Sequence, residues 1–384
     1  MKFFQSKTLM RKQAAIILSA SLVLFFSSCA NDNTATSTTI DSTNTTSNES
    51  STAKKELKPA GDAPAWAPSI TDEMQVVMDK LASYGDPAIE TVSAEKARTL
   101  HTPTDAVMDV MKEHSIAMPA PGCDTTGKEI SVNGGTIHAR IYTPKGATAA
   151  MPVIVYYHGG GWVIANINVY GASAQSLCEQ TGAVVVAVEY RQGPEHKFPT
   201  AHNDAFAAYQ WVLKNAASLN VDTARIAVAG ESAGGNLACN VSIMARDKGI
   251  KMPTHQLLVY PVANNDMNSE SYLKYAAAKP LNKPMMEWFA KNYLPNMAAA
   301  ADARISLVKA NLKGLPPTTI IAAEIDPLTT EGKLLADKLK EAGVTVDYKL
   351  YDGVTHEFFG MGTVIPQAKD AMAKAAGNLK GAWN

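Results

Sequence analysis

Charge imbalance and metal-binding patterns are both scarce in this sequence. Lys and Arg number 35 against 36 Asp and Glu, so the formal net charge is −1, and no basic patch points to a nucleic acid. The 4 cysteines include no C-x-x-C pair, and no two histidines stand at metal-ligand spacing. We therefore expect no nucleic-acid partner and no metal. The composition, 46% hydrophobic and 18% charged, is that of a globular protein with a large core.

Apolar runs long enough to cross a membrane are also missing. The run over residues 14–26 is too short for a comfortable span, and Lys2, Lys7, Arg11 and Lys12 precede or flank it. A charged stretch, a short apolar stretch and the small residues after it are typical of a secretory signal peptide. We expect one over residues 1–28.

The end of this signal suggests a lipid anchor. Residues 26–29 read Phe-Ser-Ser-Cys and resemble a bacterial lipobox, with Phe26 in place of the usual leucine. In such lipoproteins the cut falls before the cysteine, so Cys29 would carry the lipid and the exported protein would be anchored to a membrane, at its periplasmic or cell-surface face. The alternative is an ordinary signal peptide cut nearby.

The next segments differ sharply in composition. Residues 29–58 are rich in Ser, Thr and Asn and poor in large apolar groups, which predicts a disordered tether. Residues 59–125 read mainly as helices: one over 72–81, one that Ser93 would cap, and one over 104–114. The methionines of these helices most simply form a packed face.

The remainder, residues 126–384, alternates strands with helices and predicts a largely parallel sheet covered on both faces. The segment 264–311 is longer than a plain crossover. Cys178 and Cys239 fall in expected helices and look like small buried hydrophobes; with Cys123 they make an odd number after Cys29, so they cannot all pair. Eight strands are expected, over 129–132, 137–142, 153–157, 184–188, 226–229, 256–261, 318–323 and 346–351.

The motif Gly-Glu-Ser-Ala-Gly-Gly at residues 230–235 is the most informative stretch. It lies between an apolar strand-like run and a helix-compatible run. G-x-S-x-G in this context predicts a sharp turn that holds Ser232 in a strained conformation, with its hydroxyl exposed as a nucleophile.

A glycine-rich loop follows an earlier strand, where residues 158–162 read His-Gly-Gly-Gly-Trp. Glycines let backbone N–H groups approach a developing oxyanion closely. The expected donors are Gly159, Gly160 and, from the serine turn, Ala233; Gly161 would replace Gly159 if the loop were rotated.

A serine nucleophile needs a base and an acid that orients it. His356 follows a strand and a turn, which favours it as the base over His255 at a strand entry. Glu324 and Asp326 both lie at the end of the strand over 318–323, and spacing alone does not choose between them.

The chain resembles the bacterial hormone-sensitive-lipase family of α/β-hydrolases over residues 65–384. This resemblance implies an α/β-hydrolase fold with a helical cap formed by 59–125, to which 264–311 would add a second piece. It assigns the acid to Asp326, leaving Glu324 a structural neighbour. The motifs that carry it are His158-Gly159-Gly160-Gly161-Trp162, Tyr190-Arg191, Pro194-Glu195, Phe198-Pro199, residues 230–235, Asp326-Pro327-Leu328 and His356-Glu357-Phe358.

Three positions depart from the family pattern: Glu189, Glu231 and Thr330 stand where Asp, Asp and an acidic residue are common. The departures leave the proposed triad untouched. Glu195 and Asp204 are expected to hold loops by ion pairing or capping.

Together these features predict a serine carboxylesterase for short- to medium-chain, small-molecule esters, with no cofactor. Ser232 would attack, His356 would move the proton and Asp326 would orient His356. The methionines of the cap would then line an acyl or alcohol pocket. Alternatives are hydrolysis of another carbonyl bond, such as an acetylated sugar, amide or formamide, and a non-catalytic binding protein on the same scaffold.

Overall fold

A sheet of eight strands in the order β1-β2-β4-β3-β5-β6-β7-β8 organises the part of the chain that the computed structural model describes, residues 57–146 and 148–384. The expected signal peptide, Cys29 and nearly all of the tether lie outside it. No helix in these ranges is long and apolar enough to span a membrane. The strands are β1 (Cys123–Val132), β2 (Gly135–Pro144), β3 (Met151–Tyr157), β4 (Val184–Glu189), β5 (Val221–Glu231), β6 (His255–Val259), β7 (Thr318–Ile325) and β8 (Val346–Thr355).

The sheet is mostly parallel, as the alternation of strands and helices predicted. Only β1–β2 and β2–β4 pair antiparallel, and the other neighbours are parallel. All eight expected strands are present. β1 begins at Cys123, inside the range 59–125 assigned to the helical segment. The sequence did not predict this early start, because the first half of the strand is exposed and polar and carries no apolar pattern.

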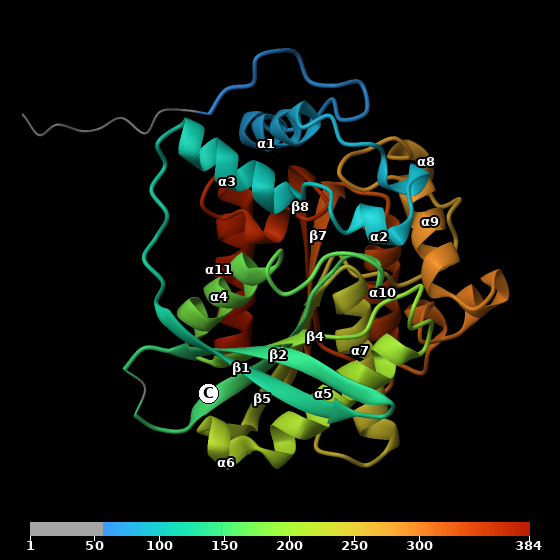
Figure 1. Cartoon of the computed structure of the whole chain (residues 1–384). Helices are drawn as coiled ribbons and strands as arrows, with labels where there is room; N and C mark the ends of the chain where they lie inside the picture. Colours follow the sequence, from blue (N-terminus) through green and yellow to red (C-terminus); the bar gives the residue numbers. More distant parts are fainter. Residues whose placement is uncertain (1–56, 147) are drawn as a thin grey trace, which may run out of the picture. The chain divides into compact units, whose positions relative to one another are not determined.

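Helices cover both faces of the sheet (Figure 1). Those of the described residues are α1 (Asp72–Ser83), α2 (Ala94–Ala97), α3 (Pro103–Glu113), α4 (Gly171–Thr181), α5 (Thr200–Lys214), α6 (Ala216–Leu219), α7 (Ala233–Asp247), α8 (Glu270–Lys274), α9 (Lys283–Tyr293), α10 (Thr329–Glu341) and α11 (Pro366–Gly381). Short 3-10 turns lie at Ile89–Thr91, Met297–Ala301, Leu307–Lys309 and Phe358–Gly360.

Alternate residues of the central strands feed two separate cores. Val153, Val155 and Tyr157 of β3 pack in the core that includes buried residues of α5, α7 and α10. Ile154 and Tyr156 point to the opposite face, whose core includes residues of α4 and α11. Because both faces are covered, β3 and β4 are apolar over nearly all of their length and β5 over residues 226–230, and this made them recognisable in the sequence.

Helices α1, α2, α3, α8 and α9 belong to the two segments expected to form the cap, and Figure 1 shows α1 and α3 together at the top of the view. Their apolar residues continue the two cores, as Met74 does in the core of Ile154 and Phe289 in the core of Val155. Ser93 caps α2 as predicted, its hydroxyl accepting a hydrogen bond from Lys96 N at 3.2 Å. Thr102 and Asp105 form a reciprocal capping box at the start of α3, so the sequence itself fixes where this helix begins.

The interpretation of Cys178 as a buried hydrophobe is wrong. Cys123 at the start of β1 and Cys178 in α4 form a disulfide that closes a sequence separation of 55 residues. Cys239 in α7 is free and buried, as predicted. The pairing was not visible in the sequence, because a buried cysteine in a helix gives the same pattern with or without a partner.

Candidate active site

The turn from β5 into α7 holds Ser232 in a conformation that L-residues rarely adopt, with φ 57° and ψ −118°. Two glycines make this turn possible. A Cβ at Gly234 would lie 2.0 Å from Tyr157 O, and one at Gly230 would lie 2.1 Å from Gly234 O. Ser232 therefore has a strained backbone, which the close packing of the start of α7 against the ends of β3 and β5 enforces.

Asp326 and His356 lie side by side because β7 and β8 end together, with Ile325 paired to Thr355. His356 Nδ1 is 2.7 Å from Asp326 Oδ2, and both side chains are buried. Burial lowers the pKa of His356, but the Asp326 carboxylate and its hydrogen bond outweigh it and leave the pKa above its ordinary value. The pair is arranged to hold and stabilise an imidazolium.

Ser232 is positioned near Asp326 and His356 by contacts with the end of β6. Its N–H donates to Val259 O at the end of β6, at 2.8 Å, and the next residue, Tyr260, places its ring 4.4 Å from that of His356. No side-chain hydrogen bond joins Ser232 to His356 in the described ranges. In free hydrolases such contacts are often long and tighten once substrate is bound.

The alternatives for acid and base lie elsewhere. Glu324 accepts hydrogen bonds from Gly353 N and from Ser69 Oγ, both at 2.8 Å, and its carboxylate has no contact with His356. His255 is the first residue of β6 and bonds Thr319 Oγ1 at 2.9 Å. Both are structural contacts.

The glycine loop lies against the serine turn because β3 and β5 are neighbours, with Tyr157 paired to Gly230. Gly159 approaches so closely that a Cβ there would lie 3.2 Å from Glu231 O. Gly160, with φ 93°, accepts from Val163 N and Ile164 N and turns the loop back.

The N–H of Ala233 belongs to the first turn of α7, where amides have no acceptor within the helix. The three expected oxyanion donors, in Gly159, Gly160 and Ala233, thus come from adjoining backbone segments.

Gly161, the third glycine of the loop, packs against a side chain and not against backbone. A Cβ there would overlap the ring of Phe289 in α9, at 2.3 Å, and its φ is 58°. The loop is therefore packed directly beneath a cap helix.

Arg191 and Asp204 secure the next loop. Arg191 Nη2 lies 2.7 Å from Asp204 Oδ1, and Asp204 is buried. Glu195 pairs with Arg98 of the segment after α2, at 2.8 Å. The expectation that Glu195 and Asp204 hold loops is confirmed, and neither touches Ser232 or His356.

The sequence analysis did not identify two carboxylates that lie beside the expected triad residues, one buried and one partly buried. Glu231, directly before Ser232, accepts short hydrogen bonds from Tyr156 and Tyr260. Glu357, directly after His356, accepts one from Tyr170 at 3.0 Å. Their positions next to Ser232 and His356 could have drawn attention to them in the sequence. Their tyrosine partners could not be predicted, because these tyrosines come from three separate parts of the chain.

Burial is the main cause that raises the pKa of both carboxyls. The tyrosine hydrogen bonds act in the opposite direction for each. His356 also lowers the pKa of Glu357, and the Asp326 carboxylate raises it. The site therefore concentrates acidic groups around one histidine.

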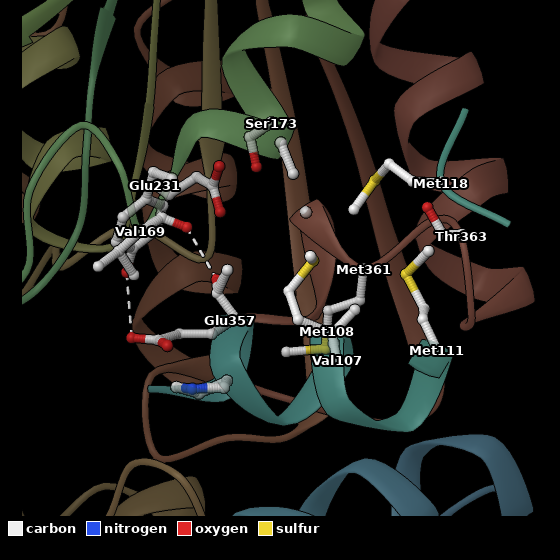
Figure 2. Close-up of a pocket in the computed structure, with 15 residues that line it drawn as sticks. Val107, Met108, Met111, Met118, Val169, Ser173, Glu231, Glu357, Met361 and Thr363 are labelled. Carbon is white, nitrogen blue, oxygen red and sulfur yellow. Dashed lines mark hydrogen bonds between the residues drawn. The ribbon is translucent and has the colours of Figure 1, made fainter. Parts of the chain in front are cut away.

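A small apolar cavity of about 80 Å³ opens beside these carboxylates (Figure 2). Met108 and Met111 of α3 line it, as expected for the cap methionines, together with Met118 and Met361. Glu231, Ser173 and Glu357 form its polar side.

A second cavity of about 510 Å³ shares Pro103, Val169 and Glu357 with the first. It also touches Ile164 and Ala165 at the end of the glycine loop. Both cavities therefore reach the residue next to His356.

No group of three or more His, Cys, Asp or Glu side chains within the described ranges could hold a metal ion. The arrangement can instead support nucleophilic attack at a carbonyl carbon, since it combines a strained serine, a histidine bonded to a buried carboxylate and a loop of close backbone amides.

Comparison with known proteins finds relatives in both sequence and structure. A family model described as the α/β-hydrolase fold matches residues 154–360. Carboxylesterase NlhH of Mycobacterium tuberculosis is 36% identical over 248 residues, which cover 64% of this chain and 78% of that protein. Ethyl acetate hydrolase of Pseudomonas putida is 32% identical over 256 residues, covering 66% and 80%.

The solved structures agree with these relatives. A thermostable esterase from Pseudomonas putida superposes with a TM-score of 0.75 at 33% identity, covering 83% of this chain and 99% of that one. The carboxylesterase EstE1, cloned from a metagenomic library, gives 0.70 at 37% identity, covering 77% and 99%. The chain therefore belongs to the esterases of the α/β-hydrolase fold family.

Proposed function

We propose that this esterase acts through a Ser232-His356-Asp326 triad and an acyl-enzyme. The observation that carries the proposal is the 2.7 Å contact between His356 Nδ1 and Asp326 Oδ2, at strand ends adjacent to the strained Ser232. No other buried carboxylate of the site contacts a ring nitrogen of His356 in the described ranges.

Ser232 Oγ attacks the ester carbonyl while His356 Nε2 accepts its proton. The Asp326 carboxylate holds the Nδ1 proton and stabilises the imidazolium. The N–H groups of Gly159, Gly160 and Ala233 donate to the oxyanion, which collapses as His356 returns the proton to the leaving alcohol. Water, activated by His356, then releases the acid and restores Ser232.

The acyl group is short in this proposal. The methionine-lined cavity of about 80 Å³ is small beside the neighbouring cavity of about 510 Å³, which favours a short acyl chain. A relative named for ethyl acetate supports the same size class. Flexible methionine side chains would let the cavity accept somewhat longer chains.

Hydrolysis of nitrophenyl esters from acetate to palmitate tests both parts. Wild type should be fastest on acetate to butyrate, and Ser232→Ala should lose activity by at least about 10³-fold while keeping its melting temperature. Near-normal turnover by Ser232→Ala would refute the nucleophile assignment. An optimum at palmitate would refute the size of the acyl cavity.

We also propose export and lipid anchoring at Cys29. The Cys123–Cys178 disulfide supports export, because disulfides persist in oxidising compartments outside the cytosol. Fractionation of cells that make wild type or Cys29→Ser tests the anchor. Wild type should sediment with membranes and the variant should not; equal retention would contradict anchoring at Cys29.

A further inference from the structure

The larger cavity combines an apolar wall, which includes Met78 and Met285, with more polar side chains than the methionine cavity has. It spans about 510 Å³, within the range of about 300–1,000 Å³ typical of small-ligand pockets. Its walls come from the cap segments around Arg98 and Asn282 and from the end of the glycine loop at Ile164. Several amide and carboxylate side chains reach it, so it suits a ligand with polar groups.

Glu357 stands where the two cavities meet. Its backbone is left-handed, with φ 68°, a conformation that favours glycine over a side chain as large as glutamate. Oε1 accepts from Tyr170, whereas Oε2 has no protein donor in the described part of the chain. A strained, partly exposed residue that keeps one free acceptor beside a catalytic histidine is typical of a functional contact.

Glu231 provides the contrast. Each of its oxygens accepts a hydrogen bond, one from Tyr156 and the other from Tyr260, and the residue is 1% exposed. Its carboxylate is a structural acceptor for two tyrosines. Of the two carboxylates, only Glu357 lines the larger cavity and has an oxygen that accepts no hydrogen bond from the described part of the chain.

Three amides around the larger cavity also keep one polar group free. Gln192 Nε2 donates to the carbonyls of Ile164 and Ala165, which leaves its Oε1 as an acceptor. Asn166 Oδ1 accepts from two backbone amides and Asn282 Oδ1 accepts from Met285 N, so each leaves an NH₂ group as a donor. No protein partner for these free atoms is found within residues 57–146 and 148–384.

We propose that the larger cavity binds the alcohol half of the ester and that this half is a polyhydroxylated group, with Glu357 Oε2 accepting from one of its hydroxyls. This inference rests on the proposed function, because it concerns the substrate of the same serine. Each hydroxyl both donates and accepts, so a polyol matches a wall that presents free acceptors and free donors together.

Other classes of alcohol fit this cavity less well. An apolar alcohol would bury Glu357 Oε2 and the free amides without partners, which is unfavourable. An anionic group would meet four carboxylates in this wall, those of Asp86, Glu90, Glu189 and Glu357. Of the two basic side chains there, Arg98 is already paired with Glu195, which leaves Lys279. A quaternary cation is usually held by aromatic faces, and His101 is the only aromatic ring among the residues lining this cavity.

Two acetate esters of similar size, each with a six-membered ring next to the ester CH₂ group, test the proposal. One is 6-O-acetylglucose and the other is cyclohexylmethyl acetate, which lacks every hydroxyl. We expect wild type to prefer the sugar ester in kcat/KM by at least about tenfold. The Glu357→Gly variant should reduce this preference at least about tenfold, mainly through KM for the sugar ester.

Three further measurements separate recognition from structure. Glu357→Gly should melt no lower than wild type, because glycine relieves the positive φ. Glu357→Gln should retain part of the preference, since its amide oxygen still accepts. The Glu324 carboxylate does not line this cavity, so Glu324→Gln should leave the preference for the sugar ester unchanged.

Equal kcat/KM for the two esters in wild type, or an unchanged preference in Glu357→Gly, would overturn the inference. Nitrophenyl acetate separates this from failure of the proposed function. If wild type hydrolyses nitrophenyl acetate in a Ser232-dependent way but shows no preference for the sugar ester, only the polyol inference fails. If Ser232→Ala retains that activity, the triad itself is wrong.

Discussion

Arg98 and Glu195 form a two-pronged ion pair between the cap and the loop after β4, with Nη1–Oε1 and Nη2–Oε2 both at 2.8 Å. The hydrogen bond from Arg98 lowers the pKa of Glu195 to about 2. Arg98 also donates to Val163 O at 2.8 Å and to Gly193 O at 2.6 Å. One side chain thus ties the cap to the segment that continues the glycine loop.

Replacement of Arg98 should therefore slow catalysis from a distance. We expect Arg98→Ala to lower kcat/KM for nitrophenyl acetate by about tenfold, because Val163 and the preceding loop lose an anchor and amide positions matter to within about 1 Å. Glu195→Gln should have a smaller effect, since Arg98 keeps both carbonyl contacts. Equal rates for wild type and Arg98→Ala would show that the loop holds its shape without this anchor.

The two carboxylates at the end of β7 should differ sharply in importance. Asp326→Asn should lower kcat by about 10³–10⁴-fold, because an amide cannot hold the Nδ1 proton of His356 or stabilise its charged form. Glu324→Gln should lower kcat less than about threefold. Steady-state kinetics of both variants decide the point, and the reverse order would move the acid to Glu324.

The pH dependence of activity follows from the raised pKa of His356. Only the neutral imidazole accepts the proton of Ser232, so kcat/KM should fall as the pH drops through this pKa. The acid limb of the profile should have its midpoint above 6.5, the ordinary histidine value. Because the Asp326 carboxylate raises the pKa, Asp326→Asn should shift the residual midpoint downwards; an upward shift would contradict this account.

Replacing two buried glycines by alanine tests where the structure has room for a Cβ atom. Gly234→Ala should destroy the serine turn, since its Cβ would lie 2.0 Å from a backbone oxygen that cannot move away. Gly332 lies inside α10, where a Cβ would have Pro261 Cδ at 4.0 Å, an ordinary van der Waals distance. Gly332→Ala should stabilise the protein by about 0.5–1 kcal/mol with unchanged activity. Thermal unfolding and kinetics of both variants check the pair.

The sequence predicted the sheet well because its central strands are buried on both faces and contain apolar runs, such as those over 153–157 and 184–188. It also placed Ser232, Asp326 and His356 at strand ends that the fold brings together. It could not predict the partners of Glu357 and Glu231, since Tyr170, Tyr156 and Tyr260 reach them from distant elements. The anchoring by Arg98 likewise depends on how the cap crosses the loop, which no local pattern encodes.

The sequence did not predict the Cys123–Cys178 disulfide, because the two cysteines meet only through the fold. We predict that this bond stabilises the folded protein. Closing a 55-residue separation limits the unfolded chain, so removal should cost about 2–4 kcal/mol. The double variant Cys123→Ser/Cys178→Ser should unfold at lower denaturant concentration, yet hydrolyse nitrophenyl acetate normally at 25 °C. An unchanged unfolding midpoint would mean that the bond adds no stability.

The state of the cysteines also determines how motion of this molecule can be observed. Cys239 is fully buried in α7, and burial raises the pKa of its thiol to about 12, while the other two described cysteines are bonded to each other. The catalytic region therefore presents no reactive thiol to solvent. A single cysteine introduced at an exposed cap position such as Leu273 would be the sole site for a fluorophore in a protein truncated after the tether, so opening of the cap during turnover can be followed without background labelling.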